Sequence, residues 1–260
     1  MIAPGTWIAS NSVGGLKLLL LKDLRVFIVH AHHEPKSFNG SLTRHATTAL
    51  EAAGHAVVVS DLYAMGFNPV SDRRNFITTK DPNFLHQQSE EIYASENKGF
   101  APDIRAEMDK LSWCDVLVLQ FPLWWFGLPA ILKGWVDRVF AMHWAYGGGK
   151  YYDRGPFAGK RAMCSVTVGN VASAYSESGM NGPISSILFP INHGILYFTG
   201  FTVIEPFVIF APRRMGQQER EIHLKSYSER LLNLSSAPLL VYRKLEEHDE
   251  KWVLKISPKN

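Results

Sequence analysis

The stretch LRVFIVHA at residues 24–31 decides the fold class, because it is short, rich in β-branched residues and apolar on both faces. Such a stretch is typical of a central strand in a parallel sheet that helices cover on both sides. A polar segment follows, and then a helical pattern over residues 42–53, with Gly54 at a position that often ends a helix. The run HAVVVSDL at residues 55–62 predicts a second strand, which completes one strand–helix–strand unit.

The rest of the chain repeats this alternation of strand and helix. No element is predicted in the polar stretch from residue 63 to about residue 102, which is rich in Asn, Asp, Gln and Pro. The elements predicted beyond it are helices over 103–111, 129–142, 182–198 and 217–232, and strands over 115–122, 161–169 and 201–210. This order predicts an α/β protein with a doubly wound parallel sheet and helices on both faces, whose ligands should collect at the carboxyl ends of the strands.

The chain divides into three segments by composition. Residues 1–23 mix Gly, Ser, Asn and Pro without a period, and we expect a poorly ordered N-terminal extension there. The alternating pattern occupies residues 24–234, which we expect to form one domain. Residues 235–260 form a charged C-terminal tail that either packs on the domain or stays mobile.

Composition excludes several classes of protein. The 260 residues are 46% hydrophobic and 20% charged, and the net charge of +3 is too small to indicate nucleic acid or a membrane surface as a partner. Only two cysteines occur, Cys114 and Cys164, without metal-ligand spacing, so we expect no disulfide framework and no metal site, and the cytoplasm fits best. Because no run of 18 apolar residues occurs, membrane insertion is not expected.

Three loops after predicted strands carry the residues best suited to ligand binding. Ser37, Phe38 and Asn39 immediately precede a helix, so this loop is either a plain N-cap or a phosphate site at the helix N-terminus. The aromatic loop PLWWFG at residues 122–127 either folds into the core or forms a wall for a planar ligand. Gly169 belongs either to a routine turn or to a loop whose backbone amides approach a ligand closely.

Motifs of other enzyme classes do not occur. The sequence has no GxGxxG after the first strand, no GxxxxGK[ST], no GxSxG and no HExxH. Their absence disfavours a standard dinucleotide fold, a P-loop enzyme, an α/β-hydrolase and a zinc protease, respectively.

Taken together, the loops resemble the NAD(P)H dehydrogenase (quinone) family, the flavodoxin-like quinone reductases. The resemblance runs from about residue 24 to residue 232 and covers most of the chain. It is carried by H-x(4)-S-F-N at 32–39, SDLYAMGFNPV at 60–70, QFPLWWFGLPAILKGWVDRVF at 120–140, YDRGPF at 152–157 and GILYFTGF at 194–201.

The resemblance implies a flavodoxin-like fold and an enzyme that takes a hydride from NAD(P)H onto FAD and passes two electrons to a quinone in a ping-pong cycle. The implied FAD-binding residues are His32, Ser37, Phe38 and Asn39 for the phosphate and ribityl region, Pro122, Leu123, Trp124, Trp125 and Phe126 along the ring, Thr167, Gly169 and Asn170 at its pyrimidine edge, Tyr175 at a ring carbonyl, and Arg220 near the adenine.

The resemblance also implies a homodimer with its active sites at the interface. Trp144, Tyr146 and the helix carrying Trp135 are expected to supply apolar area for it. The implied catalytic residues are Gly169, Tyr175 and Asn181, and the implied quinone pocket consists of Trp125, Phe126, Tyr146, Gly148, Asn181 and Phe198.

Four residues depart from the family pattern. Asn181 stands where well-studied animal members have a histidine, so a proton relay through that position is not expected. Asn170 replaces the second glycine of the flavin loop, and Gly148 replaces an aromatic gate residue, which should open the quinone pocket. Leu85 aligns with a glutamine that reaches the adenine half of FAD, so FMN stays open as the cofactor.

Two other functions stay open at this point. A regulatory or nucleotide-sensing protein, such as an ancillary subunit of a potassium efflux system, could use the same flavodoxin-like body. A one-electron carrier of the flavodoxin type is disfavoured, because such carriers are small and acidic. The aromatic loop and Tyr175 favour the enzyme.

Overall fold

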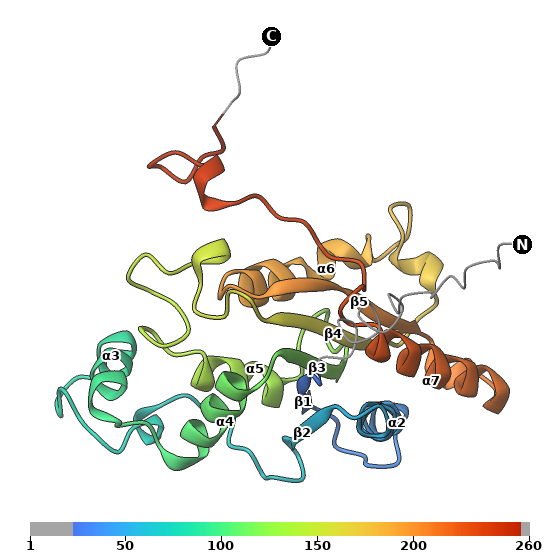
Figure 1. Ribbon diagram of the computed structural model, residues 1–260, viewed down its shortest axis with the longest axis horizontal. Coiled ribbons are helices and arrows are strands. Elements are labelled where there is room, and N and C mark those ends of the chain that lie inside the picture. The colour runs from blue at the N-terminus through green and yellow to red at the C-terminus, as the bar shows by residue number, and fades with distance from the viewer. Residues whose placement is uncertain (1–22, 256–260) are drawn as a thin grey trace, which may run out of the picture.

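The computed structural model describes residues 23–255, so the predicted N-terminal extension lies outside the described residues except for Asp23. Five parallel strands form one sheet in the order β2-β1-β3-β4-β5 (Figure 1). They are β1 (Arg25–His30), β2 (Ala56–Asp61), β3 (Val116–Pro122), β4 (Arg161–Val168) and β5 (Thr202–Phe210). The predicted doubly wound parallel sheet is confirmed.

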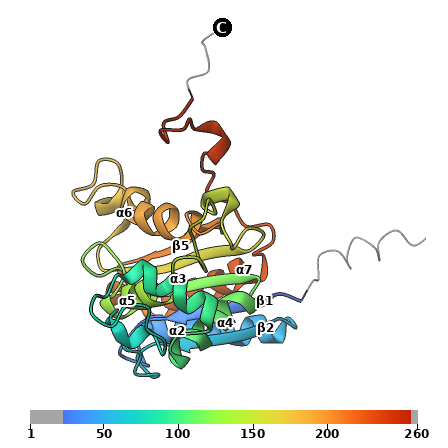
Figure 2. The same ribbon diagram turned by 90° about the vertical axis from the view of Figure 1, so that its left-hand side faces the viewer.

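Helices pack on both faces of this sheet (Figures 1 and 2). Alternation along β1 creates the two cores, because Val26 and Ile28 point to one face and Phe27 and Val29 to the other. The first core is closed by α2 (Phe38–Ala52) and α7 (Gln217–Leu232), and the second by α4 (Pro102–Trp113), α5 (Ala130–Val139) and α6 (Ile184–Ile191).

Two elements differ from the sequence prediction. The helix expected over residues 182–198 is split, since α6 passes directly into a π-helical turn, Asn192–Tyr197. The stretch from 63 to 102 contains an unpredicted helix, α3 (Gln87–Asn97). Its inward face carries Glu90 and Glu91, whose carboxylates accept backbone N–H groups instead of packing against apolar groups, so no apolar period marks the helix.

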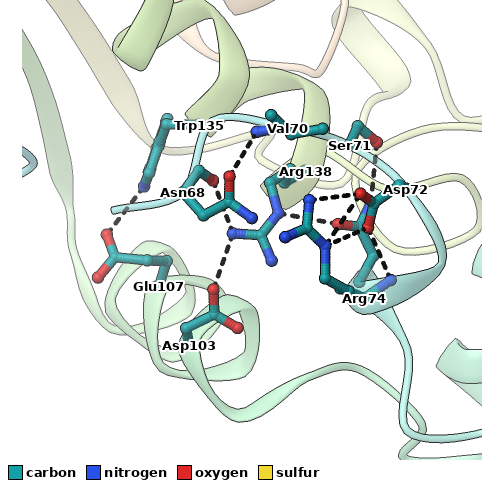
Figure 3. A network of polar contacts seen from close by, with 10 residues as sticks. Asn68, Val70, Ser71, Asp72, Arg74, Asp103, Glu107, Trp135 and Arg138 are labelled. Atoms are coloured by element: carbon teal, nitrogen blue, oxygen red, sulfur yellow. Dashed lines mark hydrogen bonds and ion pairs between the residues drawn. The ribbon is translucent and has the colours of Figure 1, made fainter. Parts of the chain in front are cut away.

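Arg138 on α5 anchors the long segment between β2 and α4 (Figure 3). Its guanidinium is 2% exposed and donates to the Asn68 carbonyl at 2.9 Å, to Asn75 Oδ1 at 2.8 Å and to Asp103 Oδ2 at 2.7 Å. It also lies over the Phe67 ring at 5.1 Å. A buried cation with these partners holds the segment in one place without an apolar core of its own.

The order of the strands places a switch point between β1 and β3. The helix after β1 lies on one face and the helix after β3 on the other, so a crevice opens between the two carboxyl ends. The register sets His30 beside Gln120, and Pro122 beside Thr167. The loops that follow β1, β3 and β4 therefore meet at one edge of the sheet.

The C-terminal tail begins by packing on the domain. Leu240 N donates to the Val203 carbonyl at 2.9 Å and Glu205 N to the Pro238 carbonyl at 2.8 Å, which covers the open edge of β5. Beyond this edge the chain rises above α6 and continues into a 3-10 turn, Leu245–Glu247, and a short bridged loop (Figures 1 and 2). Within residues 23–255, no helix has the length and apolar character needed to cross a membrane.

Candidate functional site

A cleft of about 350 Å³ lies at the switch point. Thirteen residues line it, from the carboxyl ends of β3 and β4, the loops after β1, β3, β4 and β5, and the helices α2 and α7, namely His32, Ser37, Phe38, Asn39, Pro122, Leu123, Trp124, Thr167, Val168, Gly169, Pro212, Arg213 and Arg220. The structure thus brings together most of the residues predicted to bind a cofactor. Trp125, Phe126, Asn170 and Tyr175 were predicted with them and do not line the cleft.

The N-terminus of α2 forms one end of the cleft. Ser37 caps the helix, and its hydroxyl accepts the Gly40 N–H at 3.1 Å. A Cβ at Gly40 would lie 2.3 Å from the Pro35 carbonyl oxygen, so only glycine allows the loop to turn this tightly into the helix. Helix geometry leaves the amides of Phe38 and Asn39 without a carbonyl partner in the helix, and they offer a site for an anion.

A buried chain of amides connects this helix to the sheet. Asn39 is 4% exposed and sits between Gln120, whose Nε2 donates to Asn39 Oδ1 at 2.9 Å, and Thr167, whose Oγ1 accepts from Asn39 Nδ2 at 2.8 Å. These bonds join α2, β3 and β4 directly under the cleft. They fix the position of the helix N-terminus relative to the Thr167 loop.

His32 forms the wall next to the helix. Its ring stacks on His33 at 4.7 Å and lies 6.0 Å from the ring of Trp124. Partial burial, together with the neighbouring His33, lowers the pKa of His32, which favours the neutral ring at pH 7. Because Nδ1 accepts the Glu34 N–H at 3.0 Å, the neutral ring carries its proton on Nε2 and can donate from there.

The aromatic loop divides at a tight turn. Trp124 and Gly127 exchange two backbone hydrogen bonds, at 3.2 and 3.0 Å, and the two residues between them have positive φ, 49° at Trp125 and 58° at Phe126. Both φ values are positive, as in a type I′ turn. The turn directs Trp124 to the cleft, whereas Trp125 is 97% exposed and Phe126 is 52% exposed.

Two arginines line the cleft on the α7 side. The Arg220 guanidinium lies 5.9 Å from the Phe38 ring centre, and Arg213 comes from the 3-10 turn after β5, Pro212–Arg214. The sequence prediction missed Arg213 and its neighbour Pro212. The signal was present, because the run APRR directly follows a predicted strand whose carboxyl end should face ligands.

The glycine loop after β4 leaves room at the cleft. A Cβ at Gly169 would meet no atom within 4 Å, so the chain itself does not require glycine there, whereas a ligand that approaches the backbone closely would. Tyr175 packs against the Phe210 ring at 5.8 Å, and Asn181 N donates to the Ala174 carbonyl at 3.0 Å. Of the three predicted catalytic residues, Gly169 lines the cleft, whereas Tyr175 and Asn181 do not.

The residues predicted for the quinone pocket lie in separate places. Tyr146 and Phe198 contact each other, with ring centres 5.6 Å apart, while Gly148 is in an exposed turn at φ 60°. Neither these three residues nor Asn181 line the cleft of their own chain. Among the described residues, a single chain does not assemble the predicted pocket.

The aromatic residues expected to supply apolar area for a dimer are largely used within the chain. Trp135 is fully buried, and its Nε1 donates to Glu107 Oε2 at 2.9 Å (Figure 3). Trp144 packs edge-on against Phe157 at 5.5 Å. The expectation that the helix carrying Trp135 exposes surplus apolar area is therefore wrong, because that ring belongs to the core beneath α4.

Comparisons with known proteins agree with this geometry. A family model described as a flavodoxin-like fold matches residues 24–232. Ribosyldihydronicotinamide dehydrogenase (quinone) of Pongo abelii is 41% identical over 208 residues, covering 80% of this chain and 90% of the relative. The chain belongs to the NAD(P)H dehydrogenase (quinone) family.

Two further relatives support the family assignment. NAD(P)H dehydrogenase (quinone) 1 of Cavia porcellus is 41% identical over 211 residues, covering 81% of this chain and 77% of the relative. A solved structure of a Klebsiella pneumoniae protein assigned as a quinone reductase superposes with a TM-score of 0.87 at 38% identity, covering 89% of this chain and 94% of that one.

Proposed function

We propose that the protein is an NAD(P)H:quinone oxidoreductase that binds a flavin in the cleft. The observation that carries the proposal is the composition of the cleft lining. Ser37 and the α2 amides, His32 and the two arginines are groups suited to an anion, while Trp124 and Gly169 are suited to a flat ring.

FAD fits the cleft better than FMN. The α2 N-terminus can hold one phosphate, and Arg213 and Arg220 provide two more cationic groups on the α7 side, where a second phosphate and an adenine would lie. FMN would leave these two guanidinium groups without a ligand. Bound FAD would supply a ring that accepts a hydride from NAD(P)H and passes two electrons to a quinone, in a ping-pong cycle.

The residues of the chain would bind and orient the two reactants and stabilise charge. Asn39 would lie at the phosphate and ribityl region and Thr167 at the ring edge, with the hydrogen bond between the two side chains fixing their relative position. The backbone of the Gly169 loop would face the charge that develops during reduction. Tyr175 and Asn181 would assist from the neighbouring loop. We assign Tyr175 the role of a hydrogen-bond donor and Asn181 that of a polar neighbour that cannot release a proton.

The quinone pocket would be completed in a homodimer. Tyr146, Gly148 and Phe198 do not line the cleft of their own chain, and Trp125 and Phe126 are exposed beside it. A second copy that packs over the exposed pair would place its own Tyr146 and Phe198 near the ring. The proposal also places the enzyme in the cytoplasm, since Cys114 and Cys164 are both free and buried.

The hydride donor has two candidates. The name of the Pongo abelii relative refers to ribosyldihydronicotinamide, and that of the Cavia porcellus relative to NAD(P)H. We therefore include dihydronicotinamide riboside beside NADH and NADPH. The regulatory alternative is not favoured, because these relatives are named as dehydrogenases.

The decisive experiment is purification followed by cofactor analysis and a steady-state assay. We expect a yellow protein that releases FAD on denaturation and oxidises one of the three donors with a simple quinone along parallel-line ping-pong kinetics. Light scattering should give the mass of a dimer. A protein that stays colourless after incubation with FAD and FMN, or a coloured protein that reduces no quinone, would refute the proposal.

A further inference from the structure

A second cavity of about 430 Å³ lies between the C-terminal segment and the body of the protein. Its lining consists mainly of rings and comes from three regions, with Tyr152 before β4, Phe189 and His193 on α6 and the π-helical turn, and Val241, Tyr242, Arg243, Leu245, His248 and Trp252 on the C-terminal segment. Among the described residues, the two cavities share no lining residue.

The rings surround the cavity as a cage. His193 contacts three of the other lining rings: it is stacked on Phe189 at 4.6 Å, edge-on to Tyr242 at 4.9 Å and tilted to Tyr152 at 5.4 Å. Trp252 packs edge-on against Tyr152, with ring centres 6.3 Å apart. Cavities of this size that are lined by aromatic rings with a few polar groups are typical of small-molecule sites.

The backbone is strained where it builds this cage. Tyr152 and Trp252 have φ of 50° and 65°, a region that large side chains rarely adopt. His193 and Tyr197 are presented by the π-helical turn, a rare form that occurs often at functional sites. Strained residues of two distant segments thus meet around one cavity.

The cavity carries little net charge. Arg243 is paired with Glu247 at 2.7 Å within the C-terminal segment. Burial lowers the pKa of His193 and raises that of Tyr242 to about 12, so both are uncharged at pH 7 and can exchange hydrogen bonds with a ligand. An uncharged ligand loses less hydration than an ion on entering such a site.

We propose that this cavity binds a small, uncharged, planar aromatic compound, which packs against the rings of Trp252 and Tyr242 and places a polar substituent at His193. The inference is independent of the proposed function, because it concerns neither the cleft nor electron transfer. Tyr152 also packs edge-on against Phe198 at 5.4 Å, so Tyr152 connects this cavity with a ring that we place in the quinone pocket of a dimer.

The test uses 2-naphthol as the probe and isothermal titration calorimetry on the full-length protein as purified. We expect saturable binding of one naphthol per chain, unchanged by saturating FAD. Trp252→Ala and His193→Ala should each weaken binding about tenfold or more, the loss of one ring contact with its buried area. Phe84→Ala removes an equally exposed ring outside the cavity and should leave the affinity within about twofold.

Three results would overturn the proposal. The first is the absence of saturable binding, and the second is a naphthol affinity in both cavity variants equal to that of the wild type. The third is competition by FAD, which would place the probe in the cleft instead. Since Trp252 is 59% exposed on the C-terminal segment, its replacement should leave folding intact, so that variant remains informative even if His193→Ala fails to fold. A Trp252→Ala variant that binds naphthol normally but no longer dimerises would show that the rings serve a second copy instead.

Discussion

Replacement of Asn39 by alanine tests the central link between the fold and the cleft. The change removes two side-chain hydrogen bonds, at 2.8 and 2.9 Å, from a residue that is 4% exposed. Gln120 is fully buried, and its Oε1 already lacks a partner, so a flip of its amide cannot restore a bond. A buried donor left without a partner costs about 1–3 kcal/mol, and the bond to Thr167 adds about 1 kcal/mol.

We therefore expect Asn39→Ala to lower the free energy of unfolding by about 2–4 kcal/mol, which corresponds to a fall in Tm of roughly 4–16 °C for a chain of this size. Urea denaturation and thermal melts of the flavin-free protein would measure it. The matched control is Asn97→Ala, because Asn97 is exposed and its amide bonds only a carbonyl of its own helix. The control should change stability by less than about 0.5 kcal/mol.

The same variant should also bind flavin more weakly, because the α2 N-terminus and Thr167 would lose their fixed relative position. Titration of the refolded protein with FAD would measure this effect separately from stability. An Asn39→Ala protein as stable as the Asn97→Ala control would refute the account of the buried amide chain. Normal stability combined with weak FAD binding would show instead that Asn39 acts only through the ligand.

Three further predictions concern the cleft, the catalytic loop and α3. Gly169→Ala should weaken FAD binding about tenfold without lowering Tm, since only a ligand would meet the new methyl group. The matched control is Gly194→Ala, where a Cβ also meets no atom within 4 Å but the residue lies outside the cleft. This control should leave the affinity for FAD unchanged. In stopped-flow reduction by NAD(P)H, Tyr175→Phe should slow the reaction about tenfold, and a rate equal to that of the wild type would contradict the proposed role of Tyr175. Asn181→His should introduce a pH dependence of the reduction rate between about pH 6 and 8 that the wild type lacks. Burial raises the pKa of the Glu91 carboxyl, so the folded chain binds the carboxyl proton more tightly than the unfolded chain. The stability that protonated Glu91 contributes should therefore decline as pH rises from about 4.5 through the raised pKa. Denaturation midpoints of Glu91→Gln, measured over the same pH range, should lack that decline.

Apolar periodicity predicted most of the fold because the sheet is buried on both faces. The strands contain continuous apolar runs, and α7 was predicted with its observed bounds, Gln217–Leu232. The predicted site residues that line the cleft together lie at a strand end or in the segment that follows it, such as Ser37, Trp124 and Thr167. A parallel sheet fixes those positions in space, so their neighbours follow from the strand order.

Segments held by polar contacts could not be predicted in this way. The α3 helix packs through Glu90 and Glu91, and the segment before it is anchored by Arg138, whose partners Asn75 and Asp103 lie far away in sequence (Figure 3). Such contacts leave no period in the sequence, and each depends on the whole fold being in place. Arg213 was missed for a different reason: the run APRR follows a predicted strand, but the prediction considered only the loops after three other strands, and the turn after β5 brings Arg213 to the cleft.

The aromatic loop shows where sequence reasoning stops and geometry adds information. Trp124 and Trp125 are adjacent, yet a turn with two positive φ values sends one ring to the cleft and the other into solvent. Neither Trp125 nor Phe126 is a residue that favours this turn, and each such conformation costs on the order of 1 kcal/mol. If the strained turn served only packing within the chain, the Trp125 and Phe126 rings would be buried. Instead, both rings are exposed beside the cleft. The strain therefore supports a role for Trp125 and Phe126 in contacts with something outside their own chain, as the proposed dimeric quinone pocket requires.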